Sequence, residues 1–506
     1  MKTKNNQIRK NVLLTSIYFF VNTGINFYLS SYVINNIGIS ANGFISLANS
    51  FVDYASLVTV ALNSVAGRFI SIYASKGEYE KAKKYFNSAV GADLVIGLLT
   101  LGIGILGVIN LEKIIEIPIE MIWDVKILFC LVFINFFLSI MISVFSVSTF
   151  IVNRMDLAAL RRTEGVILKA VLLIGLFSVF SPKLYFVSVV SISYSIYYLI
   201  FNVFYLKRYC PDLKIEMRFF SLKHFLEMIS SGIWNTITQL GFILTSGLDL
   251  LICNKWLGAV AMGQMSFPKQ LYNIITGFIS TLVTAYQPTF VRLYAEGNID
   301  KLKTRLTEAM GVSGILSSII ITDVVVYGKD FLKLYIPGQD IQLIWILMIL
   351  SIQVLFVSGT QYPLYYIYTL TNKLKVNSIV EIFSGIINVG IVFILLRNTE
   401  LGIYAVAGVS TLVGIIKNLF FTPMYSAYCL KISKKTFYPQ IIRYIVALGL
   451  TLFVNWRISK LFVIQSWMSL MIVGCISIVI GGLIGFIIQL NASYRHAIQK
   501  KLLERI

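Results

Sequence analysis

The sequence predicts an all-α integral membrane protein of about 14 transmembrane helices, arranged as two six-helix bundles plus two C-terminal helices. Three observations predict it: an apolar composition, a regular succession of apolar runs and an internal repeat. Hydrophobic residues make up 57% of the 506 residues and charged residues only 13%, a composition that cannot cover a water-soluble surface. At roughly 20 residues per span, the chain has no room for a soluble catalytic domain.

Apolar runs long enough to cross a bilayer recur along the whole sequence, and we interpret each of them as one span. The runs cover residues 11–36, 44–67, 87–110, 127–150, 164–181, 184–206, 225–253, 259–291, 307–327, 341–369, 376–396, 402–427, 438–456 and 464–490. Lysine and arginine are roughly three times as frequent in the connections on the side of the N-terminus as in those on the other side. This bias predicts that both termini lie in the cytoplasm, and it explains the net charge of +20 without a nucleic-acid partner.

Cysteine and histidine are too few and too scattered to indicate a metal site or a catalytic triad. The five cysteines form no Cys-x-x-Cys pair, and the two histidines stand in basic polar segments. The sequence therefore predicts neither metal ligands nor catalytic residues, and we expect a protein that is not an enzyme.

A repeat at an offset of 220 residues is the most informative feature of the sequence. The segment 38–46, after the first span, resembles the segment 258–266, after the seventh, and the agreement extends into the connections after the second and eighth spans. The matched pairs are Gly38 and Gly258, Ala41 and Ala261, Gly43 and Gly263, Ser46 and Ser266, Gly77 and Gly297, Lys81 and Lys301, and Lys83 and Lys303. Because an even number of spans separates the copies, we expect two bundles of the same orientation, residues 1–210 and 211–430, followed by two additional helices and a cytoplasmic tail in 431–506.

Polar residues follow single faces of the first, second, seventh and eighth spans. They predict a central cavity between the two bundles, where rocking of one bundle against the other gives alternating access. In chain order they are Asn22 and Asn26; Asn49, Asp53, Ser56, Asn63 and Gly67; Gln239, Ser246 and Asp249; and Lys269, Asn273, Thr276, Ser280, Thr284 and Gln287. For the small polar residues, the alternative that they only hold helices together is equally good.

Ionisable residues inside the runs are stronger candidates, because a charge near the middle of a bilayer costs at least roughly 2.5–3.5 kcal/mol and therefore tends to face a partner or water. Asp53, Asp249 and Lys269 are the best placed. Lys269 lies at a level close to Asp53, so we expect it either to pair with Asp53 across the two bundles or to bind an anionic substrate by itself. A second set lies deeper or nearer the inner ends of the spans: Asp93, Lys169, Asp323, Glu381 and Lys417.

A family resemblance rests on the segments around the repeat. Asp249, an apolar run, Leu257–Gly258 and Gly263 precede the eighth span, segment 37–43 repeats this pattern, and 76–81 and 296–301 are similar basic loops. In these features, and in its layout over essentially the whole chain, the sequence resembles the polysaccharide-transport branch of the multidrug/oligosaccharidyl-lipid/polysaccharide (MOP) exporter superfamily. The resemblance implies a MATE-like fold and a bacterial plasma-membrane flippase that moves an undecaprenyl-pyrophosphate-linked oligosaccharide to the outer leaflet, for O-antigen, capsule or exopolysaccharide assembly.

The resemblance also implies roles for the polar residues. Lysine is a suitable partner for phosphate, so Lys269, Lys417 and Arg292 are expected to bind the headgroup, and the other expected substrate-binding residues are Asn22, Asn26 and Asn273. Asp53 and Asp249 are expected to respond to a coupling ion or to form an ion pair. No cofactor is expected, and coupling to a proton or a sodium gradient stays open. The implied partners are the lipid-linked oligosaccharide, membrane lipids, and a polysaccharide polymerase with its chain-length machinery.

Two other functions compete with this interpretation. A multidrug or cation antiporter of the same superfamily has the same fold, although lysines in the middle of spans argue against a site for organic cations. A membrane-embedded glycan polymerase or acyltransferase is expected to carry a catalytic constellation in a large external loop or an intramembrane His/Asp pair, and the sequence contains neither.

Overall fold

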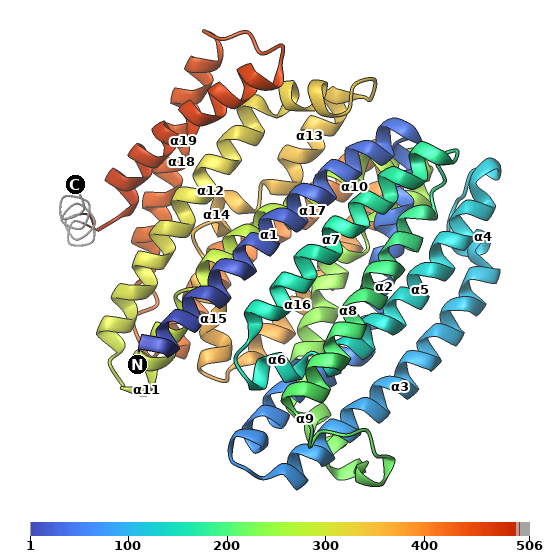
Figure 1. The fold of residues 1–506 in the computed structure, drawn as a ribbon. Coiled ribbons are helices and arrows are strands. Elements are labelled where there is room, and N and C mark those ends of the chain that lie inside the picture. Colours follow the sequence, from blue (N-terminus) through green and yellow to red (C-terminus); the bar gives the residue numbers. More distant parts are fainter. Residues whose placement is uncertain (1, 492–494, 496–506) are drawn as a thin grey trace. The chain divides into compact units, whose positions relative to one another are not determined.

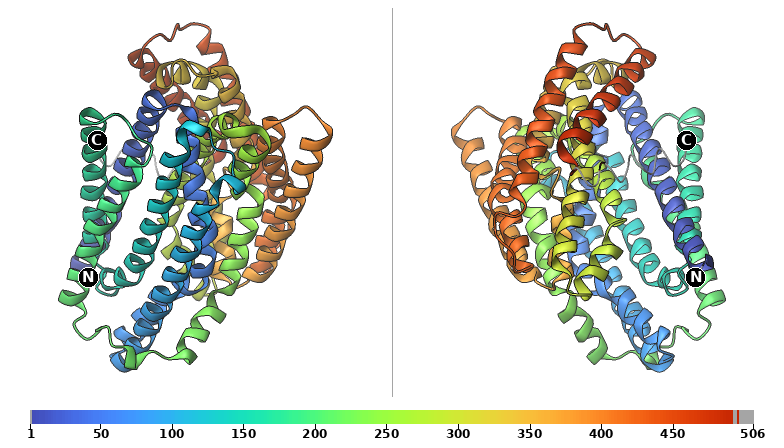
Figure 2. Two further views of the ribbon diagram at one scale, coloured as in Figure 1. Left: turned by 90° about the vertical axis from the view of Figure 1, so that its right-hand side faces the viewer. Right: turned by 90° about the vertical axis from the view of Figure 1, so that its left-hand side faces the viewer.

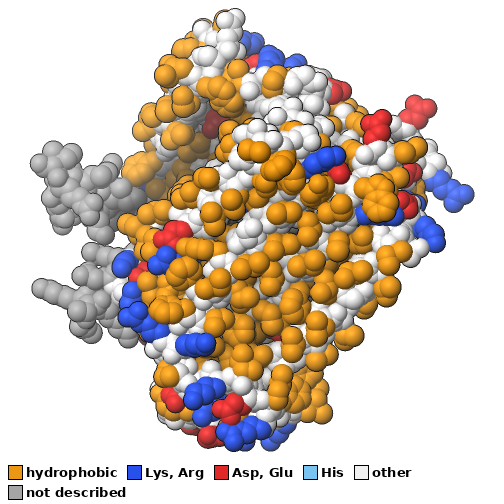
Figure 3. All heavy atoms as spheres, turned by 45° about the vertical axis from the view of Figure 1, so that its right-hand side comes forward, with side chains coloured by type: hydrophobic (Ala, Val, Ile, Leu, Met, Phe, Trp, Pro, Cys, Tyr) orange, Lys and Arg blue, Asp and Glu red, His pale blue; other side chains and the backbone are white. Residues whose placement is uncertain are grey.

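The computed structural model describes residues 2–491 and 495, and this part of the chain consists of helices joined by turns, with no strand. Every predicted run falls on a helix, or on a helix with a short helical continuation, so the predicted all-α membrane fold is confirmed. Ten helical segments in the described part are long and apolar enough to cross a membrane. Hydrophobic side chains cover the helix walls in Figure 3, and charged side chains gather near the helix ends. Most of the predicted cytoplasmic tail, 492–494 and 496–506, lies outside the described residues.

The chain divides into two compact units, Met1–Gly263 and Gln264–Ile506. In the first unit, α1 packs against α2 and α7, α2 against α3 and α9, and α5 against α3 and α8 (Figure 1; Figure 2). Its elements are α1 (Lys2–Asn36), α2 (Ile39–Ser75), α3 (Tyr79–Ile109), α4 (Leu111–Ile114), η1 (Ile119–Met121), α5 (Ile122–Phe145), α6 (Val147–Ile151), α7 (Met155–Val179), α8 (Phe186–Tyr209), η2 (Met217–Phe219), α9 (Leu222–Phe242), the π-helical turn η3 (Ile243–Gly247) and the first part of α10 (Asp249–Thr284). The bundle boundaries predicted at residues 210 and 430 stay predictions.

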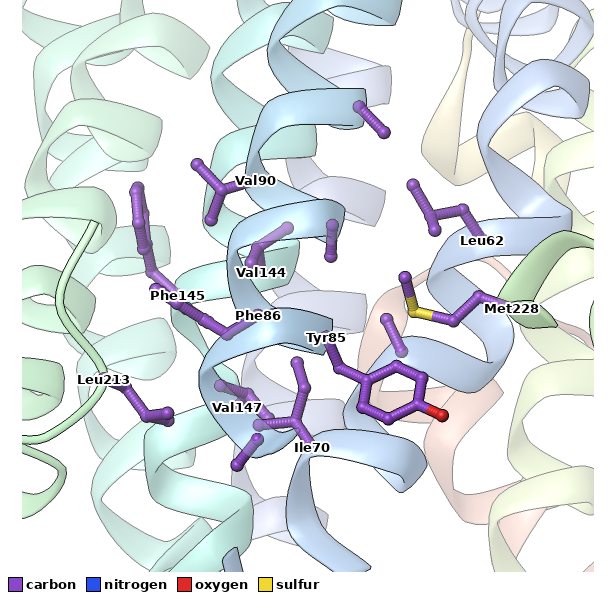
Figure 4. Packing of buried hydrophobic residues seen from close by; sticks show 14 of the residues in the cluster. Leu62, Ile70, Tyr85, Phe86, Val90, Val144, Phe145, Val147, Leu213 and Met228 are labelled. Atoms are coloured by element: carbon purple, nitrogen blue, oxygen red, sulfur yellow. The ribbon is translucent and has the colours of Figure 1, made fainter. Parts of the chain in front are cut away.

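The core of the first unit is an apolar cluster that joins the helices α2, α3, α5, α6, α8 and α9. Figure 4 shows Leu62 of α2, Phe86 of α3, Val144 of α5 and Met228 of α9 converging there. At its edge, the hydroxyl of Tyr85 donates a hydrogen bond of 2.8 Å to Glu227 Oε2. This packing fixes α2, which carries Asn63 and Arg68, beside α3, which carries Asp93.

The second unit is built around the long helix α12, which packs against α13, α18 and α19 (Figure 1). α19 approaches α12 closely because Gly485 has no side chain; an added Cβ atom would lie 2.6 Å from Ile315 Cγ1 of α12. The elements after α10 are α11 (Gln287–Ala295), α12 (Ile299–Tyr335), α13 (Ile341–Ile352), α14 (Leu355–Ser358), α15 (Tyr362–Leu370), α16 (Leu374–Asn398), α17 (Ile403–Cys429), α18 (Tyr438–Ser459) and α19 (Trp467–Gln489).

The backbone repeats where the sequence does. Gly38, between α1 and α2, has φ 120°, and its counterpart Gly258 kinks α10 with φ 86°. Gly77 and Gly297, in the turns before α3 and α12, have φ 75° and 68°. Positive φ is accessible to glycine at little cost, which explains why these positions agree between the copies when most of the apolar residues do not.

A third pair of matching turns was not recognised in the sequence, because its offset is one residue shorter than that of the other pairs. Asn153, before α7, and Asn372, before α16, both have φ 54°. In each turn the residue after the asparagine donates a backbone hydrogen bond of 2.8 Å. The Arg154 amide donates to the Thr149 carbonyl, and the Lys373 amide donates to the Tyr368 carbonyl. Asparagine tolerates the left-handed region better than most side chains, so the same residue type recurs at both turns.

Candidate functional site

A polar cavity of about 380 Å³ lies within the first unit, among α1, α2, α5, α6, α7 and α8. Two arginines line it, and its lining among the described residues contains no aspartate or glutamate. The lining residues are Thr15, Tyr18, Asn63, Ser64, Ala66, Gly67, Arg68, Ile70, Ser143, Val144, Ser146, Val147, Thr149, Phe150, Met155, Ala158, Ala159, Arg162 and Tyr198. A concave site with guanidinium, hydroxyl and amide donors but no carboxylate is suited to an anionic polar ligand.

Arg162 of α7 is the central cation of this cavity. Its Nε donates a hydrogen bond of 2.9 Å to the hydroxyl of Tyr198, and its guanidinium lies 5.2 Å from the centre of the Tyr198 ring and 5.8 Å from that of Tyr18. No carboxylate of the described residues lies within ion-pair distance of it. The two rings orient the guanidinium without neutralising it, so its charge is available to a ligand.

Arg68 of α2 is the second cation, and it is exposed beside the Phe69 ring at 5.6 Å. Both arginines were counted as loop charges in the sequence, because the apolar runs were expected to end at 67 and begin at 164. The structure extends α2 to Ser75 and starts α7 at Met155, which places both side chains on helices that line the cavity. Asn63 and Gly67, from the predicted polar face of the second span, lie in the same lining.

The start of α1 is fastened next to this cavity by Asp156. The Asp156 side chain is 1% exposed and lies 3.2 Å from Lys10 Nζ and 3.0 Å from Arg154 Nε. Gln7 Nε2 donates to the same carboxylate at 2.8 Å, and the amide of Asp156 donates to Asn11 Oδ1 at 3.0 Å. The network positions Tyr18 of α1 over the cavity by holding its helix against α7.

The structure brings together Asp53 and Asp249, the two acids predicted to respond to a coupling ion. Tyr54 donates a hydrogen bond of 2.8 Å to the carbonyl of Gly247, and both carboxylates act electrostatically on its phenol. Asp53 is exposed, whereas Asp249 is 4% exposed at the start of α10. Their proximity depends on the packing of α2 against η3. Their role in coupling stays a prediction.

Asn22 and Asn26 form a polar patch on α1, one turn after Tyr18. Asn26 Nδ2 donates to the Asn22 carbonyl at 2.8 Å and to its Oδ1 at 2.9 Å, and both residues are half-buried. Their predicted contact with the substrate stays a prediction.

In the second unit, Lys417 of α17 is paired. Its Nζ lies 2.6 Å from Glu381 Oε1 of α16, and the two side chains are 18% and 15% exposed. Next to the pair, the Tyr365 hydroxyl donates a hydrogen bond of 2.8 Å to Asn418 Oδ1. The carboxylate therefore balances the charge that the sequence assigned to a headgroup, and that assignment stays a prediction.

The other predicted substrate residues lie on α10 and α11. Lys269 is half-buried and Asn273 is exposed, with its carbonyl accepting a hydrogen bond of 3.1 Å from Thr276. Arg292 is 70% exposed, 3.9 Å from Glu296. Lys269 belongs to the second unit and Asp53 to the first. The ion pair predicted between them stays a prediction, as do the substrate contacts.

Histidine, cysteine and acidic side chains do not gather in groups of three or more that could hold a metal ion, in the part of the chain that is described. The cavity itself offers guanidinium, hydroxyl and amide groups as hydrogen-bond donors. The arrangement can bind and orient an anion inside a helical bundle.

The family described as polysaccharide biosynthesis protein matches residues 8–294, which is more than half of the chain. The chain belongs to this family. This polysaccharide biosynthesis protein is 25% identical over 456 residues to the uncharacterized membrane protein EpsK of Bacillus subtilis (strain 168), with 90% of each chain covered. The predicted resemblance to the polysaccharide-transport branch is confirmed, and the chain is a multi-pass membrane protein.

Solved structures place this polysaccharide biosynthesis protein in a known fold. The inward closed conformation of the lipid II flippase MurJ is similar with a TM-score of 0.67, 14% identity, and 96% of this chain and 100% of that chain covered. An inward-facing multidrug resistance MATE family transporter of the MOP superfamily is similar with a TM-score of 0.62, 14% identity, and 83% and 99% covered. At these identities the likeness establishes the MATE-like fold.

Proposed function

We propose that this polysaccharide biosynthesis protein is a flippase that carries an undecaprenyl-pyrophosphate-linked oligosaccharide across the bacterial plasma membrane by alternating access, for O-antigen, capsule or exopolysaccharide assembly. The observation that carries the proposal is the cavity of the first unit, where Arg162 presents a guanidinium with no carboxylate partner among the described residues. A guanidinium without a carboxylate partner favours an anionic ligand over a neutral or cationic one.

The physical problem in moving this substrate is its headgroup. Transfer of a pyrophosphate and a glycan through hydrocarbon is prohibitive, because no hydrogen bonds replace those to water. A cavity that supplies a planar guanidinium fork, phenols, hydroxyls and an amide substitutes for that hydration, and arginine matches the geometry of phosphate oxygens in two hydrogen bonds. In this proposal, Arg162 receives the headgroup, and Arg68 is a weaker contact in the same cavity. Lys269, Lys417 and Arg292 are each proposed to contact the headgroup as well, and Asn22, Asn26 and Asn273 are proposed to contact the substrate.

Relatives support the proposal. EpsK, which is similar over 90% of both chains, is described as a membrane protein, and the MurJ structure is described as that of a lipid II flippase. We further propose that both termini are cytoplasmic, that a polysaccharide polymerase and its chain-length machinery receive the product, and that Asp53 and Asp249 respond to a coupling ion.

A multidrug or cation antiporter is the second candidate, and the similarity to MATE family transporters favours it. The cavity argues against it, because a site for organic cations is expected to offer a carboxylate, and the lining has two guanidiniums instead. A membrane-embedded glycan polymerase or acyltransferase ranks lower, since no nucleophile and general base meet in the cavity.

A deletion strain tests the proposal directly, by following where the lipid-linked oligosaccharide collects. We expect intact repeat units on the cytoplasmic leaflet, with export restored by the wild-type gene and by Arg397→Gln, a control at the exposed end of α16. Arg162→Gln is expected to leave the protein inserted but to restore little export. If repeat units instead reach the outer leaflet unpolymerised, the flippase proposal is wrong and the enzyme takes its place.

A further inference from the structure

Asp93, in the middle of α3, is the most unusual carboxyl group in the first unit. Its side chain is 0% exposed, and neither carboxylate oxygen has a hydrogen-bond partner within the described chain. The turn that carries it, with Ala89, Val90 and Ala92, belongs to the apolar cluster seen in Figure 4. Buried polar groups without partners are rare and call for an explanation.

No charge compensates this carboxyl group. The only polar side chain that acts on Asp93 is Asn63 of α2. The elements packed against α3 are α2, α5, α9 and η2. None of their charged or titratable side chains in the described structure acts on Asp93. These side chains are Asp53, Tyr54, Arg68 and Tyr73 of α2, Asp124, Lys126 and Cys130 of α5, Lys223, His224 and Glu227 of α9, and Arg218 of η2. An ionised carboxylate without a partner is strongly disfavoured in such surroundings, so Asp93 carries its proton in this conformation.

A short route leads from this proton to water. Asn63, the neighbour of Asp93, also lines the polar cavity together with Arg68 and Arg162. One amide side chain therefore separates the buried carboxyl group from a space that admits water. If α2 shifts against α3 and water passes Asn63, the O–H bond of the carboxyl group breaks, the proton moves to water, and the carboxylate is left hydrated.

The second unit offers a matched comparison. Asp323 lies on α12, the helix that follows the equivalent turn of the repeat, and one of its oxygens also lacks a partner. Unlike Asp93 it is not fully buried, and Ser477 of α19 acts on it. It does not adjoin the arginine-lined cavity of the first unit.

From this geometry we infer that Asp93 is a proton-binding site of the transport cycle, loaded in the conformation described here and unloaded through Asn63 when the cavity is hydrated. The inference rests on the proposed flippase function, and it makes the proton the coupling ion. Asp93 exchanges the proton and Asn63 is a positioning residue on its route.

The test uses purified full-length protein in liposomes with a polyprenyl-pyrophosphate-linked disaccharide as probe and an imposed pH gradient. Coupling to one proton shifts the steady-state ratio of probe between the leaflets by about tenfold per pH unit. We expect this shift for wild type and Asp323→Asn, and no shift for Asp93→Asn, whose neutral amide imitates the protonated acid. A shift that persists in Asp93→Asn, or a wild type that moves the probe without responding to the gradient, overturns the inference. A wild type that does not move the probe contradicts the flippase proposal instead.

Infrared spectroscopy separates a proton site from a structural role. We expect the band of a buried protonated carboxyl group in wild type, its loss in Asp93→Asn, and its retention in Asp124→Asn, an acid 3.7 Å from Lys183. Asn63→Leu is expected to keep the band but to slow its exchange in heavy water by about tenfold or more, because the polar route is removed. Unchanged exchange in Asn63→Leu overturns the route, and a band that survives in Asp93→Asn overturns the site.

Discussion

Arg162 in the first unit and Lys417 in the second are both basic side chains far from the ends of their helices, and the chain treats them in opposite ways. Lys417 lies 2.6 Å from Glu381, so its charge is balanced within the protein. Arg162 is held by Tyr198 and Tyr18, which orient its guanidinium and leave its charge uncompensated. The comparison teaches that the partner, and not the charge, separates a structural cation from one that is available to a ligand.

The largest effect is expected from breaking the pair in the second unit. Lys417→Met leaves Glu381 without its partner at 15% exposure and should lower stability by about 3–5 kcal/mol, measured as a fall in the thermal unfolding temperature in detergent. The double variant Lys417→Met, Glu381→Leu should recover most of the loss. If the double variant is stable but fails to export, Lys417 contacts substrate as the sequence predicted, and the contrast with Arg162 disappears.

The next largest effect is expected on binding. Arg162→Gln removes charge-assisted hydrogen bonds and should weaken the binding of polyprenyl pyrophosphate by about 1.5–3 kcal/mol, with little change in unfolding temperature. The affinity of Arg162→Lys should lie between those of wild type and Arg162→Gln, because lysine keeps the charge but lacks the planar guanidinium. Equal affinity of Arg162→Gln and wild type would remove this residue from the site and leave the cavity without its central cation.

A smaller effect on stability is expected at Asp156, which holds the start of α1 next to the cavity. Asp156→Asn keeps the shape of a side chain that is 1% exposed but weakens its bonds to Lys10 and Arg154. We expect the free energy of unfolding to fall by about 1–3 kcal/mol and the backbone amides at the start of α1 to exchange hydrogen faster. The paired control is Asp124→Asn, 24% exposed and 3.7 Å from Lys183, where at most about 1 kcal/mol is expected. Equal losses in the two variants would show that Asp156 has no special part in holding α1.

The smallest effect is expected from Arg68→Gln. The side chain is exposed, and we expect the binding of polyprenyl pyrophosphate to change by less than about 1 kcal/mol, because water screens its charge. Titration of wild type and variant against the same lipid checks this. A loss as large as that of Arg162→Gln would mean that the two guanidiniums hold the headgroup together.

The fold was predictable because it depends on length and periodicity. Apolar runs located every spanning helix, and the glycines at 38 and 258 located both interruptions, since positive φ restricts the residue type at a turn whatever surrounds it. The π-helical turn at Ile243–Gly247 was not foreseen, because it falls inside a continuous apolar run.

The candidate site was less predictable, because it depends on where charged residues lie relative to helix ends and to one another. Arg68 and Arg162 were assigned to loops, since apolar runs stop at the first charge even when the helix continues for two turns. The pairing of Lys417 with Glu381 and the approach of Asp53 to Asp249 follow from helix packing between segments distant in sequence. Each of these acids and bases was visible in the sequence, but its partner was not.

The connection between α3 and α5 is attached to α10 through hydrogen bonds to its main chain. Asn254 of α10 is fully buried; its Nδ2 donates 2.9 Å to the carbonyl of Glu116, and the Glu116 amide donates 2.7 Å to its Oδ1. The amide thus imitates a neighbouring peptide group and contacts only the main chain. Since the exposed Glu116 carboxylate takes no part in these hydrogen bonds, a substitution of that side chain leaves the attachment of the segment to α10 intact.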